Sequence, residues 1–233
     1  MTLGTAVIIG AGSGLSASLA RKLAERGHPL VLGARNTSKL DDLVAETGAQ
    51  AVALEGSHPA QMETLFAGIP GRIDVAIYNP SARARGPVAT LEPDEVRRAM
   101  EITAFGSFLL GRVAAGRMLE QEPVNGARGT ILFTGASAGV KGFPQSASFA
   151  MGKFAQRGLA ESMARELHPQ GVHVAWVNID GGISNTVRAE RTDDGSDKML
   201  DPDAIADAYL GLMDQHRSTW SNEIALRPWV ERF

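Results

Sequence analysis

The sequence predicts a single α/β domain built on a doubly wound parallel sheet of about seven strands with flanking helices. Three observations lead to this fold class. Strand-like and helix-like segments alternate along the chain. The strand-like segments are apolar on both faces, as expected for a parallel sheet covered by helices. A glycine-rich turn separates the first strand from the first helix. Because 233 residues suit one α/β domain better than two, we expect residues 1–233 to form one unit.

The predicted elements follow from short apolar runs and from longer segments with helical periodicity. Strands are expected at residues 5–9, 29–32, 51–54, 73–78, 130–134, 172–177 and 222–226. Helices are expected at residues 15–26, 38–46, 59–67, 93–119, 146–167 and 202–213. The polar stretch 180–200 shows neither pattern, so we interpret it as a surface loop, with a substrate loop as one alternative. In such a fold, ligands bind at the carboxyl ends of the strands.

Composition excludes several classes of function. A net charge of -3, with both signs interspersed, gives no field that favours nucleic acid or an anionic membrane. The absence of cysteine excludes disulfides and thiolate nucleophiles, and the scattered histidines predict no metal site. No apolar run approaches about 18 residues, so we expect a cytoplasmic protein with no membrane partner.

A glycine turn follows the first predicted strand, with glycine at positions 10, 12 and 14. In a Rossmann-type domain this turn and the following helix N-terminus bind the pyrophosphate of a dinucleotide. The spacing G-x-x-x-G-x-G fits Gly10 and Gly14 and fails only at Ser16. The alternative interpretation is a tight turn with no ligand, but its position between the first strand and helix favours nucleotide binding.

The end of the second strand bears on the choice of nucleotide. An acidic residue is expected there in a protein that binds the ribose hydroxyls of NAD, and none is present. Arg35 follows Ala34 instead, and a guanidinium forms charge-assisted bonds with the 2′-phosphate of NADP. The sequence therefore favours NADP(H) over NAD(H), with an exposed loop arginine as the alternative.

These landmarks, taken in order, resemble the short-chain dehydrogenase/reductase family over nearly the whole chain. The glycine turn from Gly10 to Ser16 is similar to the family's T-G-x-x-x-G-I-G, and Asn79 matches one position of N-N-A-G after the fourth strand. Asp180 and Gly181 stand in place of the family's P-G turn. The resemblance implies that the cofactor is held by the following residues: Gly10, Ser13, Gly14, Leu15, Arg35, Asn79, Lys153, Gly181 and Ile183.

The chain departs from the family at its catalytic side chains. Where the family has Tyr-x-x-x-Lys, this sequence reads Phe149 to Lys153, so only the lysine remains. Ala136 replaces the family's serine, with Ser137 beside it, and Thr103 aligns with the family's asparagine. Phenylalanine in place of tyrosine, together with the ending at residues 227–233, is similar to one atypical branch of the family.

The resemblance implies an oxidoreductase whose catalytic positions are Lys153, Phe149 and Ser137, with a small-molecule substrate and a homodimer or homotetramer. Phenylalanine donates no proton, so Ser137, Ser146, Ser148, Lys153 or water would have to replace the phenol, or the substrate would need no acid. A small carbonyl, imine or activated alkene fits these requirements. The alternative is a catalytically silent nucleotide-binding regulatory or interaction protein, so whether turnover occurs is left open.

Two arginines follow Asn79. Arg83 and Arg85 are favoured as solvated loop residues, and binding of an anionic substrate is the alternative interpretation.

Overall fold

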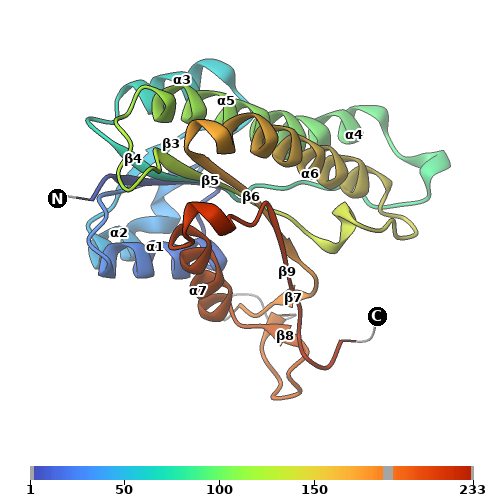
Figure 1. Ribbon diagram of the computed structural model, residues 1–233. Coiled ribbons are helices and arrows are strands. Elements are labelled where there is room, and N and C mark those ends of the chain that lie inside the picture. The colour runs from blue at the N-terminus through green and yellow to red at the C-terminus, as the bar shows by residue number, and fades with distance from the viewer. Residues whose placement is uncertain (1–2, 186–190, 232–233) are drawn as a thin grey trace.

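The computed structural model describes residues 3–185 and 191–231. Its centre is a parallel sheet with the strand order β3-β2-β1-β4-β5-β6-β9, which confirms the predicted seven-stranded α/β fold (Figure 1). The strands are β1 (Thr5–Ile9), β2 (Leu30–Ala34), β3 (Gln50–Ala53), β4 (Ile73–Tyr78), β5 (Gly129–Thr134), β6 (Val172–Ile179) and β9 (Glu223–Leu226).

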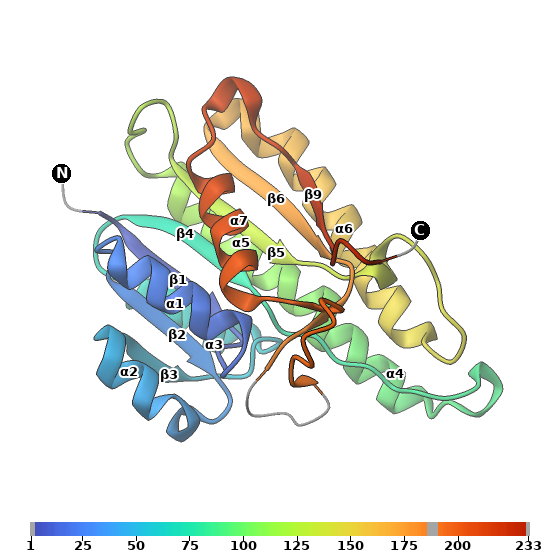
Figure 2. The same ribbon diagram turned by 90° about the horizontal axis from the view of Figure 1, so that it is seen from below.

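Helices cover both faces of the sheet. One face carries α3 (Pro59–Ala67), α4 (Pro93–Met100), α5 (Gly106–Leu119) and α6 (Ala147–Leu167), and the other carries α1 (Leu15–Glu25), α2 (Asp41–Thr47) and α7 (Pro202–Met213) (Figures 1 and 2). Each face has its own buried apolar cluster, and β1 contributes to both because its side chains alternate between the two faces. Every residue of β1 is buried, which explains why its sequence lacks the alternation typical of a half-exposed strand.

The expected long helix 93–119 needs a correction, because a π-helical stretch, Glu101–Phe105, separates α4 from α5. The Tyr78 hydroxyl at the end of β4 donates a hydrogen bond of 2.5 Å to the Ile102 carbonyl. A side chain that inserts between helical turns in this way widens the helix locally. Gly106 permits the approach, because a Cβ at this position would overlap the Tyr78 hydroxyl.

The expected loop 180–200 also contains structure that the sequence pattern did not predict. Its ends pair as β7 (Gly182–Ile183) and β8 (Met199–Leu200), a small parallel ladder apart from the main sheet. Residues 186–190 of this segment lie outside the described residues. The ladder holds Ile183 and its neighbours beside the carboxyl ends of β1 and β4, where they take part in the pocket described below.

The first and last helices are joined by two ion pairs. Lys22 lies 2.7 Å from Asp207, and Arg26 makes two hydrogen bonds of 2.8 Å to Asp214. These contacts are solvent-exposed, so their contribution to stability is small beside that of the buried apolar cluster between α1 and α7. Among the described residues, no helix is sufficiently long and apolar to cross a membrane.

Candidate functional site

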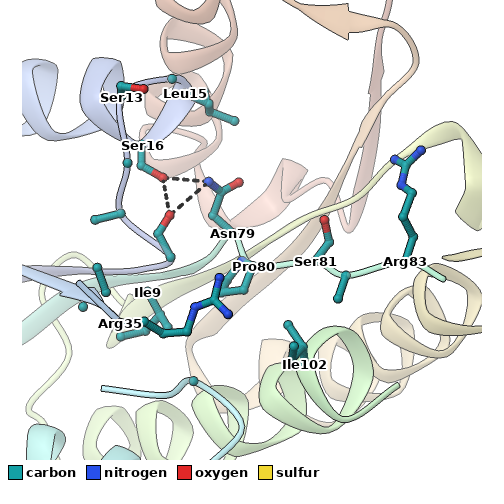
Figure 3. Close-up of a pocket in the computed structure, with 18 of the residues that line it drawn as sticks. Ile9, Ser13, Leu15, Ser16, Arg35, Asn79, Pro80, Ser81, Arg83 and Ile102 are labelled. Atoms are coloured by element: carbon teal, nitrogen blue, oxygen red, sulfur yellow. Dashed lines mark hydrogen bonds between the residues drawn. The ribbon is translucent and has the colours of Figure 1, made fainter. Parts of the chain in front are cut away.

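A pocket of about 700 Å³ opens at the carboxyl ends of β1, β2, β3 and β4. This is the edge of the sheet at which an open α/β fold binds ligands, because the crossovers diverge beside β1. Seven of the nine expected cofactor-binding residues line the pocket, and they are Gly10, Ser13, Gly14, Leu15, Arg35, Asn79 and Ile183. Figure 3 shows Arg35 and Arg83 toward opposite ends of the labelled set, with Asn79, Pro80 and Ser81 between them.

The glycine turn has the backbone that an anion site requires. Gly10 has φ +84°, and a Cβ at this position would lie 2.7 Å from the Pro80 ring, so only glycine fits. Helix α1 begins after Gly14 with no side chain capping its first amides and no acidic residue in its first turn. Uncapped amides at a helix N-terminus attract negative charge. This end of the pocket therefore fits a pyrophosphate.

Ser16 and Asn79 connect the glycine turn to the end of β4. The Asn79 amide donates to the Ser16 hydroxyl at 2.6 Å, and that hydroxyl donates to the Gly10 carbonyl at 3.0 Å (Figure 3). The Asn79 backbone N–H also donates to the Ile9 carbonyl at 3.0 Å. Ser16, which the sequence comparison treats as a departure from the glycine pattern, is thus buried and holds the shape of the turn.

The end of β2 presents a cation that no described carboxylate pairs with. Arg35 is exposed, lines the pocket and forms no ion pair with any described residue. The neighbouring Asn36 is used locally, because its side-chain oxygen accepts from the backbone N–H of Ser38 at 3.0 Å and from its hydroxyl at 2.8 Å. Glu55, after β3, lines the same end of the pocket. Arg35 is therefore the residue of this strand end that is available to a phosphate.

Lys153 lies beneath the site rather than on its surface. The side chain is only 2% exposed and is not among the described residues that line the pocket. Its ammonium donates to the Thr134 carbonyl at 2.5 Å and to the Gln156 side-chain oxygen at 3.1 Å. Gln156 also accepts from the Trp176 indole and donates to the Ser107 hydroxyl. In this arrangement the Lys153 amine is committed to a buried polar network.

Burial changes the protonation of this amine. Desolvation, with a smaller contribution from the charge of Arg83, lowers the pKa of Lys153 to about 7. The lysine is therefore close to half-charged at neutral pH. An amine in this state is able to exchange protons, although its hydrogen bonds are made to the end of β5 and to Gln156 of α6.

Phe149 lies one turn before Lys153 on α6 and also does not line the pocket. The ring is 8% exposed, and the guanidinium of Arg83 lies 3.9 Å from its centroid. The position that the resemblance aligns with the family's tyrosine is here an apolar ring covered by a cation. No proton is available from this ring.

The other expected residues have separate surroundings. Ser137 begins a short 3₁₀ turn after β5 and does not line the pocket. Gly181 is also not among the lining residues, and a Cβ built there would meet Pro228 and Leu200. Ser148 is fully buried, with its hydroxyl exchanging hydrogen bonds with the backbone of Ala84 at 2.9 and 3.0 Å. Ser148 is therefore occupied in holding the loop after β4.

Thr103 has a positioning role. The residue is fully buried in the π-helical stretch, and its hydroxyl accepts a hydrogen bond of 3.0 Å from the backbone N–H of Ala82. Together, Thr103 and Ser148 fix the segment that carries Ser81 and Arg83 along the pocket wall. The sequence analysis did not single out several lining residues. Ser81, Ser184, Asn185 and Arg191 fall in segments without periodicity, and Glu95 and Arg98 lie on α4, where helical periodicity does not show which polar side chains face a pocket.

Comparisons with known proteins agree with this architecture. The family model for short chain dehydrogenases matches residues 4–195. A short-chain dehydrogenase from Rhodopseudomonas palustris has a similar crystal structure, with 32% identity, a TM-score of 0.82 and coverage of 97% of this chain and 99% of that one. A metagenomic short-chain oxidoreductase in complex with NADP is 28% identical, with a TM-score of 0.81 and coverage of 97% and 98%.

A Listeria monocytogenes protein described as an uncharacterized oxidoreductase is 27% identical over an alignment of 248 positions, gaps included, which covers 98% of each chain. The fold, the glycine turn and these matches together define a nicotinamide-dependent class of protein. The chain belongs to the short-chain dehydrogenase family, and it is an oxidoreductase of that family.

Proposed function

We propose that this protein binds NADP(H) in preference to NAD(H) and transfers a hydride to or from a small carbonyl, imine or activated alkene. The observation that carries the proposal is that the uncapped α1 N-terminus, Arg35, Asn79 and Ile183 all line one pocket. When the cofactor is bound, its nicotinamide ring would supply the hydride in reduction and accept it in oxidation. The chain's own residues form the phosphate site, hold the turn through Ser16, and leave one end of the pocket for a substrate.

The preference for NADP(H) depends on Arg35, which faces the pocket without an ion-pair partner among the described residues. We expect Arg35→Gln to weaken NADPH binding about 10- to 100-fold, since a charge-assisted bond is lost, and to leave NADH binding unchanged. Calorimetric titration with each nucleotide measures both effects. Arg97→Gln is the matched control, because Arg97 is an exposed arginine of α4 that does not line the pocket.

Equal weakening of both nucleotides by Arg35→Gln would show that Arg35 does not select the 2′-phosphate. Failure of the wild-type protein to bind either nucleotide would contradict the proposal as a whole.

The proposal includes membership of a branch of the family in which phenylalanine, here Phe149, stands at the tyrosine position. Because Phe149 has no proton and Ser148 is occupied, the proton comes from another group or from water, or the substrate requires none. We also propose that the segment 180–200 is a substrate loop. Four of its described residues line the pocket, and this supports the proposal: Ile183, Ser184, Asn185 and Arg191.

A catalytically silent nucleotide-binding protein is the second candidate. It is favoured by one observation: neither Phe149 nor Lys153 is among the described residues that line the pocket. Substrate-dependent oxidation of NADPH across a panel of ketones, imines and activated alkenes separates the two candidates. Nucleotide binding without turnover of any compound would favour the silent protein.

We also propose that the protein forms a homodimer or homotetramer through α5 and α6. These helices and the π-helical stretch carry four exposed apolar side chains, Phe105, Phe108, Met151 and Phe154, and the rings of the first two stack with centroids 6.1 Å apart. Exposed apolar side chains favour burial against a partner. Analytical ultracentrifugation of the wild type and of Phe108→Glu at several concentrations tests the proposed oligomer. We expect Phe108→Glu to weaken the association, and a monomeric wild type would overturn the proposal.

A further inference from the structure

Arg83 is an exposed residue of the loop after β4, as the sequence favours, but its guanidinium also contacts an aromatic ring. Its backbone follows Asn79, Pro80 and Ser81 along the pocket wall, and its guanidinium carbon lies 3.9 Å from the Phe149 ring centroid. In Figure 3 the side chain extends at the end of the pocket opposite Arg35 and the α1 N-terminus. The loop that carries it is fixed by the buried hydrogen bonds of Ser148 with Ala84. Arg83 is thus held in a defined place.

The stacking leaves the binding groups of Arg83 available. A guanidinium that contacts an aromatic ring through its flat face keeps its N–H donors in the plane, pointing outward. Within residues 3–185 and 191–231, no carboxylate forms an ion pair with Arg83, although Glu95 lines the same pocket. Burial and the charges of Arg85 and Arg191 lower the pKa of Arg83, which reflects a locally positive environment. An anion placed there would relieve this repulsion.

We propose that Arg83, supported by the Phe149 ring, binds a carboxylate of the substrate, so that the protein acts on carbonyl compounds that carry an acid group. This inference rests on the proposed function, because it assigns the end of the pocket that the nucleotide leaves open. A guanidinium and a carboxylate form two parallel hydrogen bonds, which orient the substrate as well as hold it. The substitution of tyrosine by phenylalanine then gives α6 a platform for a cation in place of a proton donor.

Arg83 has two competing roles, covering the Phe149 ring and binding a phosphate of the cofactor. Each predicts a different effect of removing the arginine. If the arginine only covered the Phe149 ring, removing it would affect stability and no ligand. If it bound a phosphate of the cofactor, removing it would weaken nucleotide binding. The position of Arg83 opposite Arg35 and the α1 N-terminus argues against phosphate binding, since these groups already attract the phosphates at the other end.

The experiment is a calorimetric titration of the NADP⁺-saturated protein with 2-oxobutanoate, 3-oxobutanoate and 4-oxopentanoate, each compared with its methyl ester. We expect at least one acid to bind about tenfold or more tightly than its ester, because an ester has no charge to pair with the guanidinium. Arg83→Gln should abolish this difference and leave NADP⁺ affinity unchanged. Arg83→Lys should retain only part of it, because an ammonium lacks the planar pair of donors. Arg97→Gln again serves as the control.

Three results would overturn the inference: no preference for any acid, a preference that survives Arg83→Gln, or a loss of NADP⁺ affinity in that variant. Circular dichroism of each variant separates loss of fold from loss of binding. If the wild-type protein binds no nucleotide, the proposed function fails. The same acids and esters titrated into the nucleotide-free protein then decide the role of Arg83 by itself.

Discussion

The two ends of the pocket differ in how closely they follow the family pattern. At the nucleotide end, the glycine turn, the uncapped α1 N-terminus and Asn79 form one hydrogen-bonded unit, and even the unusual Ser16 reinforces it. Behind the opposite end, Phe149 stands where the resemblance expects a phenol, Lys153 is held in a buried network, and Arg83 covers the Phe149 ring. The comparison teaches that nucleotide binding and proton donation are structurally separable in this fold, because they depend on different elements.

The largest expected effect comes from a substitution that disrupts the glycine turn at the nucleotide end of the pocket. Gly10→Ala should lower the free energy of unfolding by about 2 to 5 kcal/mol, because the new Cβ meets Pro80 and the positive φ is strained for alanine. Gly12→Ala is the matched control, since a Cβ there meets nothing within 4 Å. Urea denaturation measures both variants. Equal stability of the two would mean that the turn is looser than the structure indicates.

A second prediction sharpens the description of the opposite end. Because the pKa of Lys153 is about 7 in the folded state and about 10.4 in an unfolded chain, the unfolded state binds more protons between these values. The contribution of Lys153 to the free energy of unfolding should therefore rise with pH in this window, by about 1 kcal/mol per pH unit. Below pH 7 both states hold the proton, so the dependence disappears.

Lys153→Met should remove this rise, as measured by the denaturation midpoint at pH 7, 8 and 9 relative to wild type. Lys39→Met changes an exposed lysine in the same way and should retain the wild-type pH dependence. If Lys153→Met kept the rise as well, the lysine would be titrating as a solvated group, and the buried network would not hold it.

The smallest expected effect concerns the missing phenol. Phe149→Tyr alone should raise carbonyl reduction less than about tenfold, well below the 10²- to 10⁴-fold typical of a general acid. The reason is that Arg83 covers the ring and the Lys153 ammonium is bound to the Thr134 carbonyl. Values of kcat/KM with NADPH over a ketone panel test this, with Phe154→Tyr, an exposed position of the same helix, as control. If Phe149→Tyr raised kcat/KM by about 10²-fold, the phenol would be the one catalytic group that this part of the site lacks.

Most of the fold could be predicted from the sequence because each buried strand and each amphipathic helix leaves a periodic signal. The π-helical stretch could not, since it arises from Tyr78 meeting the Ile102 carbonyl across 24 residues of sequence. The ladder of β7 and β8 was missed because strands of two residues have no period to detect. Both omissions concern tertiary contacts, which override local propensity.

The site divides in the same way. The residues at the nucleotide end were predictable because their spacing around the first turn is local, and the structure brings Gly10, Gly14 and Asn79 together. The stacking of Arg83 on Phe149 was not predictable, because the two residues are 66 positions apart and nothing in their spacing indicates contact. The burial of Lys153 was not predictable either, because it depends on the hydrogen bonds that join Lys153 to Gln156 and Gln156 to Trp176.

The order of strands has a consequence for the lifetime of the protein in a cell. β1 lies between β2 and β4, so the glycine turn and Asn79 belong to neighbouring strands that meet only when the two halves of the sheet, β3-β2-β1 and β4-β5-β6-β9, have joined. A nucleotide that contacts both halves binds only the joined form. At a concentration about 100 times its dissociation constant it would add about 3 kcal/mol to the stability of that form. If the nucleotide binds as proposed, its presence would protect this protein against proteases, which act on the separated halves.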